Sequence, residues 1–143
     1  MDRAAGIIIK EEKILLMHRQ KPGRDYYVIP GGDIEENETP EIAVLREIKE
    51  ETNLASEIDF LFFEFESDVF KRHEKFFMMK NISGKEKIGE PEISWQNEDN
   101  QYALEWVEIE KISKTNLLPK EIKEKIFETF HEKDSEKIAY CDM

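Results

Sequence analysis

The sequence predicts a single α/β (α+β) domain over residues 1–143, on three observations. Its length suits one domain with one core, and 39% hydrophobic residues suffice to fill that core. Two early segments, 4–9 and 13–18, are almost continuously apolar, which is typical of strands that are covered on both faces. Two further segments, 40–52 and 120–133, carry apolar residues at helical spacing. Together these patterns indicate a sheet inside a layered arrangement of strands and helices, with no internal repeat or linker.

The first two strands are expected to form a β-hairpin or to lie side by side, with Lys10-Glu11-Glu12 as the tight turn between them. A third short strand is expected over 26–29. Pro30-Gly31-Gly32 is expected to end this strand and open a loop, because glycine adopts positive φ and lets another group approach the backbone closely.

Residues 18–24 form the only basic cluster in the first half of the chain, and Pro22-Gly23 indicates that the cluster is a loop. Two interpretations stay open. The cluster is a solvated connection, or Arg19 or Arg24 binds substrate phosphate, since the guanidinium fork matches phosphate oxygens.

The segment 32–54 contains the clearest helix signal. Thr39 is a suitable N-cap and Pro40 fits the first helical position. The helix is expected to run to about Thr52, and Asn53 follows where a left-handed C-terminal cap belongs. Its apolar face is supplied by Ala43, Val44 and Ile48.

Three glutamates share one face of this helix, because side chains three and four residues apart lie above one another. Glu47 therefore lies above both Glu50 and Glu51. Like charges at this spacing repel by roughly a few tenths of a kcal/mol per pair. The face is either a solvated acidic surface, common in a chain with 33 acidic residues, or a site for a cation. The hard cation for carboxylate oxygens is Mg²⁺, or Mn²⁺ in its place.

The C-terminal half predicts strands, one long loop that is a candidate for function, and one helix. No element is expected from Asp134 onwards. The expected elements are aromatic-rich strands over 58–65 and 76–79 joined by a hairpin loop at 68–75, a polar loop over 81–101, a half-buried strand over 102–109 and a helix over 120–133.

The charge balance narrows the class of ligand. The chain has 33 acidic and 21 basic residues, a formal charge of -12, which argues against binding a nucleic acid polymer. An anionic small substrate stays open, because a bound metal reverses the local sign of charge. The one cysteine, Cys141, excludes an internal disulfide and indicates a reducing compartment. The N-terminal residues lack a long apolar run, so we expect no signal peptide, no membrane span and a cytoplasmic protein.

The spacing of fixed residues between Gly32 and Leu54 resembles the box of the Nudix hydrolase family, including its MutT-like members. The matching positions are Gly32, Glu38, Arg46, Glu47, Ile48, Glu50, Glu51 and Leu54. The one departure is Asn53, where the family pattern has glycine. Asparagine tolerates the left-handed conformation well, so we expect a modest cost in stability and little effect on chemistry. The resemblance implies an α/β/α sandwich around a mixed β-sheet.

The resemblance also implies an activity. It is the hydrolysis of a diphosphate linkage in a nucleoside diphosphate derivative by water, with Mg²⁺ or Mn²⁺ as cofactor. The resemblance implies that Glu47, Glu50 and Glu51 bind the metal, together with a backbone oxygen of Gly31 or Gly32. Glu47, Glu50 and Arg46 are implied as catalytic residues, and Glu38 is implied to support the loop or to hold a metal-bound water. A further metal carboxylate is expected from Glu98 or, as second candidate, Asp99. Which glutamate deprotonates the water stays open.

The substrate is not defined by the box. In length the chain resembles the family members that cleave nucleoside triphosphates. By the same resemblance, the lack of proline in 60–90 removes a hint of ADP-ribose specificity, and the lack of tyrosine there weakens a dinucleoside polyphosphate substrate. The resemblance thus favours nucleoside triphosphates, including oxidised ones, cleaved to a monophosphate and diphosphate. A nucleotide sugar such as ADP-ribose is the alternative, and a non-catalytic nucleotide-sensing module on the same fold is another. Isomerisation of an isoprenoid diphosphate has no support beyond the shared fold. Family members are often homodimers. Substrate-binding candidates are Arg19, Arg24 and Tyr27, and base-stacking candidates are Tyr26, Tyr27 and Trp95.

Overall fold

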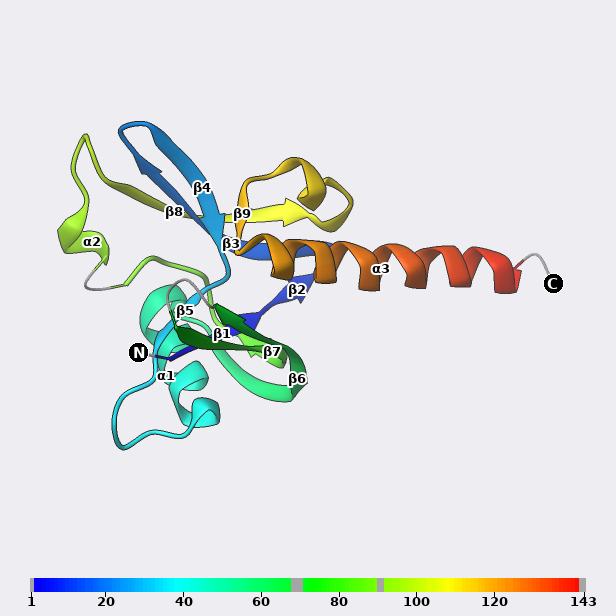
Figure 1. Cartoon of the computed structure of the whole chain (residues 1–143), viewed down its shortest axis with the longest axis horizontal. Coiled ribbons are helices and arrows are strands. Elements are labelled where there is room, and N and C mark those ends of the chain that lie inside the picture. Colours follow the sequence, from blue (N-terminus) through cyan, green and yellow to red (C-terminus); the bar gives the residue numbers. More distant parts are fainter. Residues whose placement is uncertain (1, 68–70, 90–91, 142–143) are drawn as a thin grey trace.

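The computed structural model describes residues 2–67, 71–89 and 92–141, and side chains as far as residue 130, as two mixed β-sheets with helices on either side (Figure 1). The predicted α/β class is confirmed. The elements are β1 (Arg3–Ile7), β2 (Ile9–Lys10), β3 (Lys13–Lys21), β4 (Arg24–Val28), β5 (Gly31–Asp33), α1 (Pro40–Thr52), β6 (Ala55–Ser67), β7 (Arg72–Ser83), α2 (Glu92–Trp95), β8 (Gln101–Glu108), the 3-10 helix η1 (Ile109–Lys114), β9 (Leu117–Leu118) and α3 (Lys120–Cys141).

The first sheet has the strand order β5-β1-β7-β6, with β1 parallel to β7 and the other neighbours antiparallel. The second sheet has the order β2-β3-β4-β9, and β8 also pairs with β3 along almost its whole length. Its single parallel pair is β4 with β9. The chain passes from the first sheet to the second between β1 and β2, and the predicted hairpin is the short pairing of β2 with β3.

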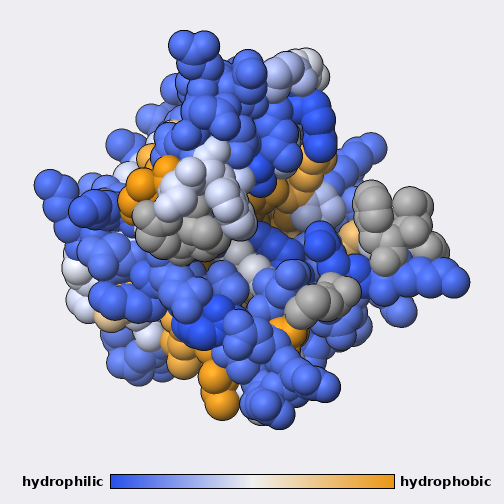
Figure 2. Space-filling view, turned by 90° about the vertical axis from the view of Figure 1, so that its left-hand side faces the viewer, coloured by the Kyte–Doolittle hydropathy of each residue, from blue (hydrophilic) through white to orange (hydrophobic). Residues whose placement is uncertain are grey.

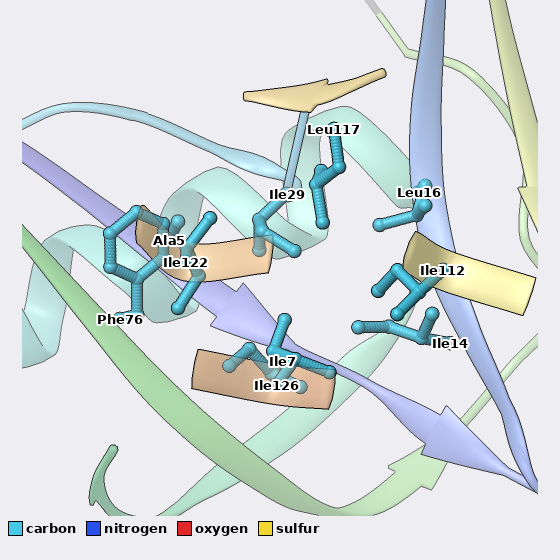
Figure 3. Packing of buried hydrophobic residues seen from close by; sticks show 10 residues of the cluster. All are labelled: Ala5, Ile7, Ile14, Leu16, Ile29, Phe76, Ile112, Leu117, Ile122 and Ile126. Atoms are coloured by element: carbon cyan, nitrogen blue, oxygen red, sulfur yellow. The ribbon is translucent and has the colours of Figure 1, made fainter. Parts of the chain in front are cut away.

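Consecutive apolar residues of the strands enter two different cores. In β1, Ala5 and Ile7 pack in the core that contains Ile122 and Ile126 of α3, and Figure 3 shows ten residues of this core. Ala4, by contrast, packs against α1, in the core formed with Ala43, Val44 and Ile48. Because successive side chains of a strand point to opposite faces, a strand between two cores must be apolar at almost every position. The near-continuous apolarity of 4–9 and 13–18 has this physical cause.

Two segments predicted as loops are strands, and both predictions were wrong. Gly31–Asp33 forms β5, where Gly31 pairs with Ala5. A Cβ on Gly31 would lie 2.3 Å from the Ala4 carbonyl oxygen, so glycine here permits close strand pairing instead of ending it. Residues 18–24 belong mostly to β3 and β4, because β8 extends the pairing of β3 as far as Gln20. Only Pro22 and Gly23, the latter at φ 75°, form the turn.

The C-terminal half contains longer elements than its sequence predicts. Strands β6 and β7 extend beyond the predicted aromatic segments at both ends, and β7 together with α2 occupies part of the predicted loop over 81–101. The middle of the predicted hairpin loop, 68–70, and residues 90–91 lie outside the described residues. Helix α3 continues to Cys141, where no element was expected, and the Cys141 side chain is also outside the description. No helix in the described ranges is long and apolar enough to span a membrane.

Helix α1 has the predicted bounds and caps. The Thr39 hydroxyl accepts a hydrogen bond from the Ile42 amide at 3.2 Å, and Pro40 is the first helical residue. Asn53 adopts the left-handed conformation at φ 67°, and its amide donates to the Lys49 carbonyl at 3.0 Å. The Asn53 side chain adds a bond that glycine cannot make, from Nδ2 to the Lys85 carbonyl at 3.2 Å.

We expect Asn53→Ala to lower the free energy of unfolding by about 1 kcal/mol, because alanine is strained in the left-handed region and cannot bond Lys85. Asn53→Gly is the matched control. It relieves the backbone but loses the same side-chain bond, so its stability should stay near that of the wild type. Urea denaturation of the three proteins measures the difference. Equal stability of the alanine variant and the wild type would contradict the strain argument.

Candidate active site

The Arg46 side chain is the centre of the polar network on α1. It donates two hydrogen bonds to the Glu38 carboxylate, from Nε to Oε2 at 2.5 Å and from Nη2 to Oε1 at 2.7 Å. Its Nη1 donates to Glu47 at 2.9 Å and to Glu50 at 3.1 Å. A further bond from Nη2 reaches the Asp33 carbonyl at 3.2 Å. These charge-assisted bonds, first of all those to Glu38, raise the pKa of Arg46 above its usual range.

Glu38 lies between the loop backbone and the helix. The Arg46 hydrogen bonds lower its pKa to about 2, helped by a bond that its carboxylate accepts from the Glu35 amide at 3.0 Å. A carboxylate held in this way stays ionised at any physiological pH. It fixes one side of the Arg46 guanidinium, and Arg46 in turn orients the carboxylates of Glu47 and Glu50.

Glu51 is the buried member of the three glutamates, with 6% of its surface exposed. Its carboxylate accepts a hydrogen bond from the Gly31 amide at 3.1 Å. Burial raises the pKa of Glu51 to about 8, and the charges of Glu92 and Glu47 add to this rise. Arg3 and the Gly31 amide act in the opposite direction without cancelling it. The ionised form of this side chain is therefore costly unless a further cation is present.

Glu47 lies against the backbone of β5. A Cβ on Gly32 would lie 2.5 Å from the Glu47 carboxyl carbon, so any other residue here would require the Glu47 carboxylate to move. Burial raises the pKa of Glu47, Arg46 opposes the rise, and the charges of Glu50 and Glu92 support it. The close approach gives Gly32 a steric role that the sequence pattern alone does not reveal.

The polar segment after β7 is anchored to the C-terminal end of α1. The Lys87 amide donates to the Thr52 carbonyl at 2.8 Å, and the Gly89 amide donates to the Glu51 carbonyl at 3.3 Å. These bonds satisfy carbonyls that the end of a helix leaves without an intrahelical partner. A Cβ on Gly89 would lie 1.8 Å from the Glu50 carbonyl oxygen, so this contact also needs glycine.

The anchored segment brings Glu92, the first residue of α2, close enough for its charge to raise the pKa values of Glu47 and Glu51. Sequence reasoning proposed Glu98 and Asp99 from this polar loop and did not consider Glu92 or Gly89. Glu98 and Asp99 lie further along, in an exposed turn where the Asp99 amide donates to the Asn97 side chain at 2.8 Å. A metal-binding role for Glu98 stays a prediction.

The three substrate-binding candidates lie on two faces of the second sheet. Arg19 stacks over the ring of Tyr102 at 4.0 Å, and Arg24 stacks over Tyr26 at 4.4 Å. Arg19 lies on the same face of β3 as Leu15, which packs in the core with α1. The structure therefore places both arginines on the face that turns towards α1.

Tyr27 lies on the other face. Its ring stacks on His18 at 4.2 Å, and its hydroxyl donates to Glu105 at 3.1 Å. His18 also bonds Glu105 and, through its second nitrogen, Asp25, each at 2.5 Å. Burial disfavours the charged imidazole, but these two carboxylates outweigh it and raise the pKa of His18. The structure does not bring Tyr27 together with Arg19 and Arg24, and its role in binding substrate stays a prediction.

The chemistry of the donors on α1 fits a hard divalent cation. No group of three or more His, Cys, Asp or Glu side chains among the described residues is already arranged as a metal cage. Arg46 binds one oxygen of Glu47 and one of Glu50, so this contact leaves the other oxygen of each carboxylate for a metal. The buried Glu51 carboxyl supplies a third donor whose ionised form a cation would stabilise. The acidic helix therefore has the donor chemistry for a divalent cation.

Comparison with known proteins identifies the family of this chain. A model of the NUDIX domain matches residues 1–130, and the chain therefore belongs to the Nudix hydrolase family. An "ADP-ribose pyrophosphatase" of Methanocaldococcus jannaschii is 50% identical over 54 residues, which are 37% of this chain and 32% of that protein. A "MutT-like protein" of Streptomyces ambofaciens is 39% identical over 56 residues, 38% of this chain and 35% of that protein. The matches thus span about a third of each curated relative.

Solved structures share the fold. The solution structure of the E. coli ORF135 protein superposes with a TM-score of 0.70 at 22% identity, covering 91% of this chain and 87% of that one. The MutT NUDIX hydrolase from Burkholderia pseudomallei gives a TM-score of 0.62 at 26% identity, covering 76% and 82%. The predicted Nudix fold is confirmed by these likenesses.

Proposed function

We propose that this protein hydrolyses a diphosphate linkage in a nucleoside diphosphate derivative with Mg²⁺ or Mn²⁺ as cofactor. Nucleoside triphosphates, including oxidised ones, are the favoured substrates, cleaved to a monophosphate and diphosphate. The observation that carries the proposal is the set of three carboxylates on α1, one of them buried with its pKa raised to about 8. A diphosphate is multiply negative, and such a site binds it only through a cation.

In this proposal, Glu47, Glu50 and Glu51 hold the metal, with the Gly31 backbone as a further oxygen donor. The metal supplies neutralisation of phosphate charge and a lowered pKa for bound water. Arg46 keeps the Glu47 and Glu50 carboxylates in fixed positions, and Glu38 fixes Arg46. The residue that accepts the proton of the attacking water is one of the three glutamates, and the oligomeric state stays a prediction.

ADP-ribose or a related nucleotide sugar is the second candidate substrate. It is favoured by the stretch of 54 residues that is 50% identical to the protein named ADP-ribose pyrophosphatase. A non-catalytic sensing module is the third candidate, but all three box glutamates are present here. A panel of nucleoside triphosphates, oxidised triphosphates and ADP-ribose, with detection of phosphate and diphosphate, separates these candidates.

We expect turnover of the preferred nucleotide to require added Mg²⁺ or Mn²⁺, because the α1 carboxylates and the diphosphate are both negative and a bound divalent cation offsets both charges. Exhaustive chelation should abolish product formation, and restoring either metal should recover it. Zinc or calcium at the same concentration serves as the comparison. Full turnover after chelation would overturn the metal-dependent proposal, and nucleotide binding without turnover under all conditions would favour the sensing module.

A further inference from the structure

An exposed tryptophan stands out on α2, on the side of the molecule that also carries α1 (Figure 1). Trp95, the last residue of α2, has 52% of its surface exposed. The side of the molecule that carries α1 and α2 is mostly hydrophilic, with hydrophobic residues only in small separate patches (Figure 2). A large aromatic ring left in water on such a surface is an informative exception, because tryptophan usually contributes its area to a core or an interface.

The backbone that carries Trp95 is held in place. The Trp95 carbonyl accepts a hydrogen bond from Asn100 Nδ2 at 3.1 Å, and Asn100 Oδ1 accepts one from Arg19 at 3.4 Å. The Ile93 amide donates to the Gly89 carbonyl at 3.1 Å, which ties α2 to the segment anchored on α1. These hydrogen bonds hold the backbone at Trp95 in place, so the position of the ring does not depend on an unanchored loop.

Trp95 lies close to a cluster formed by the rings of Tyr102 and Tyr26 and the guanidinium group of Arg19. The rings of Trp95 and Tyr102 are 6.4 Å apart and tilted by 43°. Arg19 covers Tyr102 at 4.0 Å and lies 5.8 Å from the ring of Tyr26. Tyr102 and Tyr26 are only 8% and 7% exposed. Of these three aromatic rings, Trp95 is the one that offers a surface to a flat ligand.

The tryptophan belongs to the same short helix as Glu92. Glu92, whose charge acts on Glu47 and Glu51, precedes Trp95 by three residues, about one turn of helix. The Ile93 amide bonds Gly89, and the Gly89 amide bonds the Glu51 carbonyl, so a ligand with its diphosphate at α1 and a further group on α2 would bridge two segments that are joined by hydrogen bonds. Gln96 follows directly and is exposed, so an amide that can donate and accept hydrogen bonds lies beside the ring.

We propose that the nucleobase of the substrate stacks on the exposed ring of Trp95 while its diphosphate lies at the carboxylates of α1. This inference rests on the proposed function and extends it to a base-binding subsite. Stacking accepts any base because every base has a π-face, so it favours nucleotides as a class over diphosphates that lack a base. The larger ring system of a purine should bind more tightly than that of a pyrimidine.

The test measures binding without turnover. Removing one base-stacking partner weakens binding by about tenfold. We therefore expect Trp95→Ala to bind a non-hydrolysable nucleoside diphosphate, with a methylene bridge between the phosphates, about tenfold more weakly in calorimetry. Trp95→Phe should recover most of the affinity. Ile93→Ala, which removes another exposed apolar side chain of α2, is the matched control and should bind as the wild type does.

Two further measurements separate stacking from a general loss of the site. The affinity for methylene diphosphonate, which has no base, should be the same in Trp95→Ala and the wild type. In a Trp106→Phe variant, where Trp95 is the only tryptophan, the nucleotide should quench fluorescence and methylene diphosphonate should not. Unchanged nucleotide affinity in Trp95→Ala, or an equal loss for both ligands, would overturn the inference. If the nucleotide stacks on Trp95 but is not hydrolysed, the stacking inference holds and the proposed function is contradicted.

Discussion

Replacement of Glu51 or Glu50 by glutamine is expected to lower kcat at least about a hundredfold with the fold intact. Glutamine has nearly the shape of glutamate and can still accept the Gly31 amide bond at position 51, but it has no negative charge for a metal. Steady-state assays with saturating Mg²⁺ measure the loss, and circular dichroism confirms that the variants are folded.

The matched control is Glu41→Gln, which removes a carboxylate from the exposed first turn of the same helix. It should keep wild-type activity, because Glu41 lies about two turns of the helix before Glu47 and is not one of the three clustered carboxylates. Near-wild-type kcat in both the Glu50 and Glu51 variants would remove the catalytic assignment of the acidic helix. A loss in only one of them would identify the carboxylate on which turnover depends.

The same Glu51→Gln change is expected to stabilise the metal-free protein at high pH. The pKa of Glu51 is about 8 in the folded protein against 4.5 for an unperturbed glutamate, so between these values the folded state keeps a proton that the unfolded state has lost. Wild-type stability therefore falls as pH rises through this range, by about 1.4 kcal/mol per pH unit, and the loss is complete above about pH 8. Glutamine stays neutral and avoids this loss.

Urea denaturation of the wild type and Glu51→Gln from pH 5 to 9, in the presence of a chelator, measures the effect. The stability difference should widen with rising pH and level off above about pH 8. Saturating Mg²⁺ should narrow it again, since the metal binds only the ionised carboxylate. Parallel stability curves for the two proteins would show that Glu51 titrates normally, and would contradict the burial argument.

Helix α1 could be predicted closely because its signals are local. The Thr39 cap, Pro40 and the left-handed Asn53 act within a few residues of the backbone they shape. The spacing of Arg46 and its glutamates follows from the helix geometry in the same way. These positions needed no knowledge of what packs around them.

What the sequence could not predict depends on contacts between segments far apart in the chain. Gly31 resembles a loop residue in isolation, but the Ala4 carbonyl next to it makes glycine the residue that allows a strand. Glu92 is not distinguishable from Glu98 in a polar stretch until the Lys87 and Gly89 amides bind the end of α1. Arg19 of β3 and Tyr27 of β4 lie on opposite faces of the second sheet, which becomes clear only once the pairing of the two strands gives their register.

The anchoring of Lys87 and Gly89 on α1 has a consequence for how new specificities arise. It divides the stretch between β7 and β8 into a docked part next to the carboxylate helix and a distal part, 93–100, with mainly exposed side chains. Changes in length or composition of the distal part leave the docking bonds untouched. If the distal part recognises the base as proposed, its sequence can be exchanged as an independent module while the acidic helix stays unchanged.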